Sequence, residues 1–256
     1  DYLIISVVLI IIYRKIGSQK LSFSFAIGKQ LFARSRYYIV SGMMVTVFSQ
    51  TDKIMIKTMI DDSANGYYSA AITCAAMTGF VFSALIDSMR PVVFESNKIS
   101  DERFEKNMAR LYSLIIYMGL AQSIVLTLLA DPIISVLYGK DYLPSIPLLQ
   151  IITWYSAFSY MGSVRNIWML AKEKQKYLWL INLMGAALNV AGNFALIPVL
   201  GASGAAIASV ATQFFTNFIL CLIFKPIKPT TRLIVRALNP KTIIEMIPRK
   251  ENKNVK

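Results

Sequence analysis

The sequence predicts an all-α protein, a polytopic transmembrane helical bundle, and three observations support this prediction. Hydrophobic residues make up 55% of the 256 residues and charged residues only 16%, a composition that excludes an ordinary soluble domain. The apolar residues occur in runs of roughly 20, the length at which a helix crosses a hydrocarbon core of about 30 Å. Most basic residues lie between these runs, as in the cytoplasmic connections of membrane proteins.

Composition also excludes several other classes of protein. The net charge of +13 raises the question of nucleic acid, but the basic residues are spread over short connections, so we predict no nucleic-acid partner. The absence of histidine excludes a zinc hydrolase with histidine ligands and a Ser-His-Asp triad. Cys74 and Cys221 lie in separate apolar runs and are expected to be packing residues rather than a disulfide or a metal pair.

Seven membrane segments are predicted. The first, Tyr2 to Tyr13, is about two-thirds of a crossing, and the sequence opens without methionine, so we expect it to be the truncated end of a helix in a longer chain. Six further spans follow, at about 37–60, 66–89, 107–130, 147–170, 177–197 and 203–224.

The distribution of Lys and Arg predicts the orientation. Nearly all of the 27 basic residues fall in alternate connections, whereas the opposite connections contain Lys140 alone. Both the end of the first segment and the C-terminus are therefore predicted to be cytoplasmic. We expect three parts: 1–36 as the truncated helix plus a cytoplasmic connection, 37–224 as a six-helix lobe, and 225–256 as a basic cytoplasmic tail.

The connections have individual patterns. Residues 21–36 alternate aromatic and basic side chains, which is typical of an amphipathic helix on the inner membrane surface or of a solvated basic linker. Residues 131–139 are apolar but too short to cross, so we expect them to lie along the outer interface. Residues 198–206 predict a tight hairpin whose small residues let two helices approach closely. The tail ends in a polar run, 249–256, expected to be disordered.

Four polar residues lie at a similar depth in the outer half of three spans: Asp52, Asn189, Asn193 and Ser209. At about 1.5 Å per residue they are about 6–12 Å below the outer surface. Asn189 and Asn193 are four residues apart and share a helix face. Such oxygen ligands suit Na⁺, or a protonatable carboxylate hydrogen-bonded by its neighbours. The alternative is interhelical hydrogen bonding by Asn and Ser, with Asp52 paired to a lysine.

Cationic residues indicate a second site. A 4-3-4 spacing places one set of polar residues on a single helix stripe: Thr46, Gln50, Lys53 and Lys57. Intramembrane Lys53 and Arg165 are expected to line a wet cavity, which favours an anion such as phosphate or diphosphate. Two alternatives stay open: Lys57 can extend to water near the span end, and any of these cations can pair with Asp52.

Three segments, taken in order and spacing, carry a family resemblance. They are Asp52-Lys53-Ile54-Met55-Ile56-Lys57 followed by Asn65-Gly66-Tyr67-Tyr68-Ser69-Ala70-Ala71, the turn Leu137-Tyr138-Gly139-Lys140-Asp141-Tyr142-Leu143-Pro144, and the hairpin Gly201-Ala202-Ser203-Gly204-Ala205-Ala206-Ile207-Ala208. The sequence resembles the C-terminal lobe of polysaccharide biosynthesis flippases, the O-antigen or Wzx-like transporters of the MOP (multidrug/oligosaccharidyl-lipid/polysaccharide) superfamily. The resemblance covers nearly the whole chain, with the first segment as the sixth of twelve spans.

The resemblance implies a fold and a function. It implies a MATE-like protein of two six-helix lobes around a cavity that opens alternately to each side of the bacterial cytoplasmic (inner) membrane. Such a transporter, which is not an enzyme, moves undecaprenyl-diphosphate-linked O-antigen or capsule-type repeat units to the outer leaflet. The implied partners are this lipid-linked oligosaccharide, the membrane lipids and the N-terminal lobe of the same chain.

The resemblance also implies roles for residues. The lipid II flippase branch has a sodium site in this lobe, formed by an aspartate on its first helix and polar residues on its last two. This assigns a coupling cation, and no other cofactor, to Asp52, Asn189, Asn193 and Ser209. Asn193 stands where a second carboxylate would strengthen such a site, so Na⁺ and H⁺ both stay open. Gln50, Lys53, Lys57 and Arg165 would hold the substrate diphosphate.

Two other functions are weighed against the flippase. A multidrug exporter of the same superfamily is expected to have an acidic and aromatic cavity for cationic drugs, which Lys53 and Arg165 disfavour. A membrane-bound glycan polymerase or ligase is expected to carry large outer loops with catalytic Arg, His or Glu, whereas the predicted outer connections are short.

Overall fold

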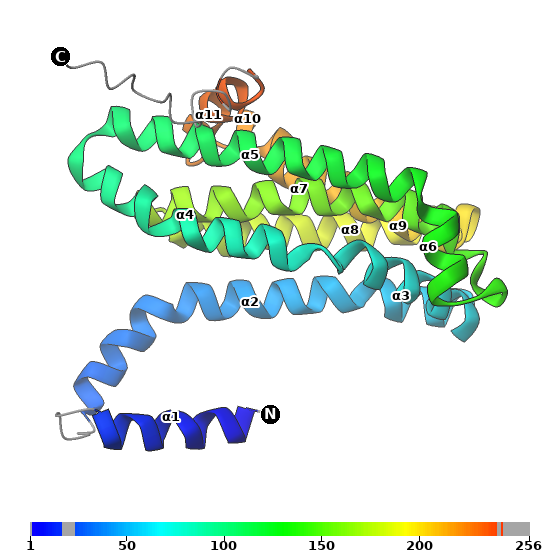
Figure 1. Cartoon of the computed structure of the whole chain (residues 1–256), viewed down its shortest axis with the longest axis horizontal. Helices are drawn as coiled ribbons and strands as arrows, with labels where there is room; N and C mark the ends of the chain where they lie inside the picture. The colour runs from blue at the N-terminus through cyan, green and yellow to red at the C-terminus, as the bar shows by residue number, and fades with distance from the viewer. Residues whose placement is uncertain (1, 17–23, 240–241, 243–256) are drawn as a thin grey trace, which may run out of the picture. The chain divides into compact units, whose positions relative to one another are not determined.

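The computed structural model describes residues 2–16, 24–239 and 242, and these residues form the predicted all-α bundle (Figure 1). The α-helices are α1 (Tyr2–Ile16), α2 (Phe25–Met59), α3 (Asp62–Ala76), α4 (Gly79–Ile99), α5 (Asp101–Leu128), α6 (Ala130–Leu137), α7 (Ser145–Ala171), α8 (Leu178–Leu200), α9 (Ala202–Phe214), α10 (Leu220–Ile223) and α11 (Pro229–Ala237). Short 3₁₀ turns occupy Lys140–Tyr142 and Gln175–Tyr177, and a π-helical turn, Phe215–Ile219, joins α9 to α10.

The chain divides into two compact units, residues 1–36 and 37–256. The first unit contains α1 and the beginning of α2. Within the described residues, the amphipathic connection expected at residues 21–36 is not an element of its own. From Phe25 onward it is already part of α2, which continues as one helix to Met59 and so includes nearly all of the predicted span 37–60. Residues 17–23 and the predicted disordered run 249–256 lie outside the described residues.

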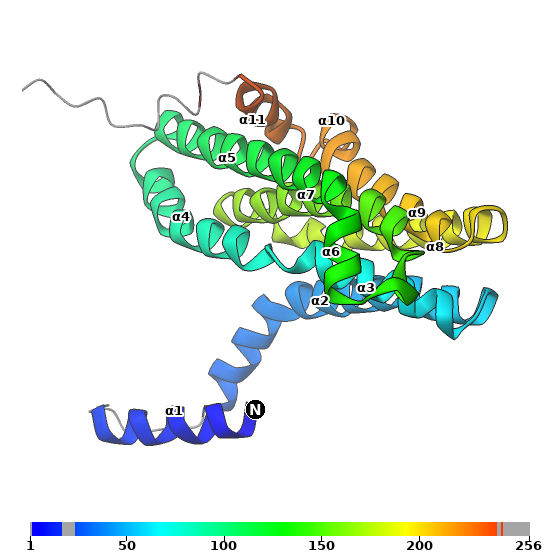
Figure 2. The same ribbon diagram turned by 45° about the vertical axis from the view of Figure 1, so that its right-hand side comes forward.

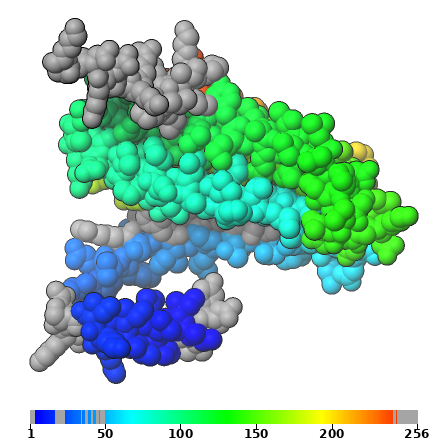
Figure 3. All heavy atoms as spheres, viewed as in Figure 1, coloured from blue at the N-terminus to red at the C-terminus, as the bar shows by residue number. Residues whose placement is uncertain are grey.

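The second unit is built around α5, α7, α8 and α9, which run side by side in both ribbon views (Figures 1 and 2). Two apolar clusters form its interior. One includes Phe104, Tyr112 and Trp168 from α5 and α7, and the other includes Ile56 and Tyr68 from α2 and α3. Side chains of α4 and α5 together form one face of this unit, with α6 at its end (Figure 3).

The connections of the second unit meet at two ends, as the alternation of basic residues predicts. At one end Lys172 forms a 2.7 Å ion pair with Asp101, and Asn97 donates to the carbonyl of Ala171 at 3.1 Å. At the other end the rings of Tyr67 and Tyr142 meet edge to face at 5.6 Å. The compartment that each end faces remains a prediction.

Three stretches of the described chain are long and apolar enough to cross a membrane: α5, residues 175–200 including α8, and residues 202–223 including α9 and α10. A fourth is added if α3 and α4 are counted as one broken span. The chain is thus a membrane protein. The other predicted segments fall on helices α1, α2 and α7, so the total of seven membrane segments stays a prediction.

The single span predicted at 66–89 is wrong in one respect, because two helices occupy this region. Helices α3 and α4 are bent by 42° at the break between them, and α4 continues to Ile99. Gly79, the first residue of α4, lies so close to α7 that a β-carbon there would be 2.7 Å from the hydroxyl of Tyr160. The break thus brings the start of α4 directly against α7.

Two predicted connections are as short as expected, while the position of residues 131–139 along the outer interface stays a prediction. Residues 130–137 form the short helix α6, far below the length of a crossing. The hairpin between α8 and α9 turns at Gly201, whose φ of 61° favours glycine. A β-carbon at Gly192 would contact Ala208 at 3.1 Å, and one at Gly204 would lie 2.3 Å from the carbonyl oxygen of Leu196. The small residues therefore permit the predicted close approach.

The replacement Gly204→Ala is expected to destabilise the protein, because the added methyl collides with rigid backbone and forces α8 and α9 apart. Overpacking of this kind costs about 1–3 kcal/mol. The matched control is Gly66→Ala in α3, where nothing lies within 4 Å of a β-carbon; its higher helix propensity leaves stability unchanged or raised by up to about 1 kcal/mol. Thermal unfolding in detergent compares the two, and equal midpoints would contradict the close approach.

Candidate functional site

The carboxylate of Asp52 is the centre of a buried polar cluster on four helices. Asp52 lies on α2 and is only 5% exposed. It accepts hydrogen bonds from the hydroxyl of Tyr68 on α3 and from Nδ2 of Asn193 on α8, each at 2.7 Å. Its third donor is the hydroxyl of Ser209 on α9. One side chain thereby connects α2 to three other helices.

Asn189 completes this cluster. Its Nδ2 donates to the hydroxyl of Ser209 at 3.0 Å, and its Oδ1 accepts from Nδ2 of Asn193 at 3.3 Å. The structure therefore brings together all four residues that depth counting selected. The sequence-based prediction did not include Tyr68. Asp52 and Tyr68 are a similar number of residues from the connection between α2 and α3, so counting along the two helices would have placed them at a similar level.

The hydrogen-bond donors around the Asp52 carboxylate are all neutral groups. Among the described residues Asp52 forms no ion pair with a lysine or arginine, so the interpretation of Asp52 as one half of an ion pair is not supported. The Oδ1 atom of Asn193 is buried and makes no hydrogen bond within the described chain. One carboxylate with several neutral oxygens suits an alkali cation or a proton.

A small cavity of about 110 Å³ adjoins this carboxylate. Its lining includes Asp52, Tyr68 and Ser209 together with Tyr155 of α7. This volume exceeds the space that a single water molecule needs. Asp52, Tyr68 and Ser209 are thus adjacent to open space, whereas Asn189 and Asn193 are buried and do not belong to the lining.

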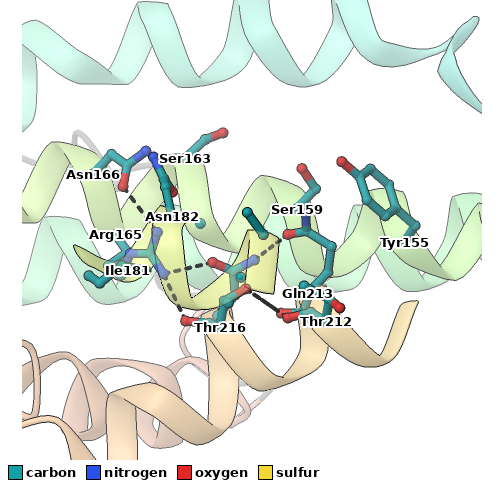
Figure 4. Close-up of a pocket in the computed structure, with 14 residues that line it drawn as sticks. Tyr155, Ser159, Ser163, Arg165, Asn166, Ile181, Asn182, Thr212, Gln213 and Thr216 are labelled. Atoms are coloured by element: carbon teal, nitrogen blue, oxygen red, sulfur yellow. Dashed lines mark hydrogen bonds between the residues drawn. The ribbon is translucent and has the colours of Figure 1, made fainter. Parts of the chain in front are cut away.

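Arg165 of α7 faces a second, larger cavity of about 200 Å³ (Figure 4). The side chain is 4% exposed. Its Nη1 atom donates to the carbonyl of Thr216 and to Oδ1 of Asn217, both at 2.8 Å, and Nη2 donates to Oδ1 of Asn166 at 3.2 Å. All three acceptors are neutral, and Nε makes no hydrogen bond within the described chain.

The π-helical turn carries the residues that hold Arg165. Thr216 and Asn217 both belong to it, and such turns occur frequently at functional sites. Asn217 Nδ2 also donates to Oε1 of Gln213 at 2.6 Å. The remaining lining combines amide and hydroxyl side chains with small and apolar residues: Ser159, Ser163, Asn182 and Thr212 beside Gly162, Ile181, Gly185 and Ala186. In Figure 4 Tyr155 lies at the opposite end of the cavity from Arg165. The polar spacing of Ser209, Gln213 and Asn217 was a signal that sequence reasoning did not use.

The structure does not bring the predicted cationic stripe to Arg165. The lining of the Arg165 cavity contains no residue of α2. Gln50 is exposed and Lys53 is half-buried. Lys57 is exposed and forms a 2.7 Å ion pair with Asp62. These three residues and Arg165 thus do not share a cavity within the described chain.

The two cavities are neighbours in the fold. Tyr155 lines both of them. Ser209 contacts Asp52, and Gln213, one turn later on α9, belongs to the chain of hydrogen bonds that leads to Arg165. A displacement of α9 would therefore alter both sites together.

Comparison with known proteins gives a family and a distant relative. The profile of the family described as "Polysaccharide biosynthesis protein" matches residues 1–147, which include Asp52 and Tyr68. An uncharacterized membrane protein of Methanocaldococcus jannaschii, MJ1068, is 27% identical over 227 residues, which cover 84% of this chain and 44% of that protein. The chain thus spans less than half the length of this relative. No solved structure matches the chain.

The replacement Tyr68→Phe is expected to lower stability by about 1.5–3 kcal/mol, because it removes a hydrogen bond to a buried charged group without leaving a cavity. Tyr67→Phe is the matched control: the ring contact with Tyr142 is retained, and the change is expected to stay within about 0.5 kcal/mol. Thermal unfolding in detergent measures both. A Tyr68→Phe protein as stable as Tyr67→Phe would show that this hydrogen bond contributes little.

Proposed function

Because the chain belongs to the polysaccharide biosynthesis protein family, we propose that it is one lobe of a flippase for lipid-linked oligosaccharides. In this proposal the lobe and an N-terminal partner lobe of the same chain transfer an undecaprenyl-diphosphate-linked glycan to the outer leaflet of the cytoplasmic membrane by alternating access. The match covers only 44% of MJ1068, which supports the presence of a second lobe in the full-length protein. Proton or sodium movement through the Asp52 cluster drives the cycle.

The buried guanidinium of Arg165 is the observation that carries the proposal. A guanidinium keeps its charge in proteins, and removal of a charge from water costs several kcal/mol unless it is compensated. Within the described chain Arg165 is held by neutral oxygens and faces a polar cavity. An anionic ligand would supply the missing countercharge, and a diphosphate offers the oxygen pairs that a guanidinium binds in a bidentate manner.

The same observation separates the flippase from a multidrug exporter. A cavity for cationic drugs needs negative charge or aromatic faces. The cavity here presents a cation, a set of amide and hydroxyl groups that includes Asn166, Asn182 and Gln213, and a single aromatic ring, that of Tyr155; its described lining has no acidic side chain. The chemistry of the Arg165 cavity favours an anionic and hydroxyl-rich substrate such as a phosphorylated glycan.

In this proposal the Asp52 cluster is the site that binds the coupling ion. A buried carboxylate exchanges its neutral donors for a proton or a small cation as the lobe changes conformation. Asn193 Oδ1, which is buried without a hydrogen bond in the described chain, is available as a ligand. Because Tyr155 and residues of α9 line both cavities, we expect ion binding at Asp52 to bias anion binding at Arg165.

Replacement of Asp52 by asparagine in the full-length protein tests the coupling. The side chain keeps its shape but cannot carry the charge, so we expect transport of lipid-linked glycan into proteoliposomes to lose its dependence on a Na⁺ or pH gradient. The loss of transport rate is expected to be at least about tenfold. Unchanged transport with unchanged ion dependence would remove Asp52 from the mechanism.

Replacement of Arg165 by glutamine tests the anion site. Pyrophosphate is expected to inhibit glycan transport by occupying this site. Loss of charge-assisted hydrogen bonds worth about 2 kcal/mol should raise its inhibition constant about thirtyfold. Arg165→Lys keeps the charge, so its inhibition constant should rise less. The control Lys57→Gln changes an exposed, ion-paired cation outside this cavity and is expected to leave the inhibition constant within about twofold. If Lys57→Gln has the larger effect, the anion binds to the stripe on α2 instead.

A further inference from the structure

Helix α11 presents a basic surface that the proposed transport cycle does not use. Residues 224–239 contain four basic side chains, Lys225, Lys228, Arg232 and Arg236, and no acidic one. All four are exposed, and within the described chain none of them forms an ion pair. We call these four residues together with Val235 and Leu238 the α11 surface.

The buried face of α11 fixes this surface in place. Thr230, Leu233, Ile234 and Ala237 are buried, and the helix packs against α5 (Figures 1 and 2). Half of the segment expected to be a basic tail is therefore an ordered part of the lobe.

Three hydrogen bonds attach the segment around α11 to the bundle. The hydroxyl of Tyr117 donates to the carbonyl of Leu238 at 2.8 Å, and that of Thr231 donates to the carbonyl of Cys221 at 2.7 Å. Lys174 donates to the carbonyl of Pro226 at 3.0 Å. Lys174 belongs to one of the basic connections, so its hydrogen bond holds the segment before α11 at the end of the lobe where these connections meet.

The exposed side of α11 combines positive charge with apolar groups. Val235 is 63% exposed and Leu238 50% exposed, beside Arg232 and Arg236. A helix face in contact with water alone gains nothing from exposed valine and leucine. An amphipathic helix that lies in a membrane interface needs both kinds of group, since apolar side chains enter the acyl boundary and basic ones meet headgroups.

We propose that the α11 surface binds the anionic phospholipid headgroups of the membrane leaflet beside it. Each basic residue near an anionic leaflet strengthens attachment by about fivefold, so that two in α11 and two in the segment just before it give a pronounced preference over a zwitterionic bilayer. Because the helix is anchored on α5, lipid binding there holds the inner end of the lobe at a defined height in the membrane. This inference is independent of the flippase proposal.

The test measures how lipid composition protects residue 235 from a water-borne reagent. The full-length Val235→Cys protein is placed in nanodiscs of phosphatidylcholine, with or without phosphatidylglycerol, and treated with N-ethylmaleimide. This reagent is uncharged and is not itself attracted to lipid charge. Mass spectrometry of the peptide gives the alkylation rate at this site alone; the chain's two native cysteines are buried. We expect alkylation to be about tenfold slower with phosphatidylglycerol.

Charge variants identify the cause of the protection. The pair Arg232→Glu and Arg236→Glu is expected to abolish the difference between the two lipids, whereas Arg232→Lys with Arg236→Lys keeps the charge and retains the difference. Thermal unfolding in detergent checks that the double glutamate protein is folded. Lys140→Glu, an exposed lysine at the opposite end of the lobe, retains the difference too. Equal alkylation rates in the two lipids, or a difference that survives the double charge reversal in a folded protein, would overturn the proposal.

Discussion

The fold of the second unit depends on how a single carboxylate is accommodated in an apolar interior. Asp52 enters the bundle on α2, where an unpaired charge is unfavourable by several kcal/mol. Donors from α3, α8 and α9 offset this cost. The same hydrogen bonds tie the helix that begins the unit to the hairpin near its end, across more than 140 residues of chain. The charge and the packing of these helices therefore depend on each other.

Helix α9 connects the chemistry of the two cavities. Ser209 of α9 donates to Asp52, whereas Gln213 of α9 accepts from Asn217, which in turn accepts from Arg165. Asp52 and Arg165 form no ion pair with each other, and within the described chain each is hydrogen-bonded by neutral groups.

Local rules predicted the helices and the grouping of four polar residues, but not the details that depend on neighbouring helices. Counting residues from the span ends grouped Asp52, Asn189, Asn193 and Ser209, because helical rise is nearly constant. The partners of Arg165 escaped prediction, since the face that α7 turns toward the π turn depends on packing over the whole bundle. The bend between α3 and α4 was not predicted either, and the close approach of Gly79 to Tyr160, which follows it, joins residues that are 81 positions apart in sequence.

The same contrast applies to the cationic stripe. Gln50, Lys53 and Lys57 do share a helix, as their spacing predicts, but a stripe on one helix does not specify what it faces. Arg165 belongs to a different helix, and periodicity carries no information about which helices become neighbours. For the Arg165 cavity and for the cationic stripe, the missing quantity was the set of contacts between segments distant in sequence.

The π turn at Phe215–Ile219 has a consequence for how this helix tolerates sequence change. Its hydrogen bonds span five residues instead of four, so the turn accommodates one residue more than an α-helical turn would. Because the widened turn takes up the extra residue, deletion of one residue there would restore ordinary α-helical turns and leave the helix beyond, with its buried Leu220 and Cys221, facing nearly the same way. The change would fall on the turn itself, which carries the Thr216 carbonyl and the Asn217 side chain that accept hydrogen bonds from Arg165. In this segment the extra residue therefore matters to the Arg165 cavity more than to the packing of the helix beyond it.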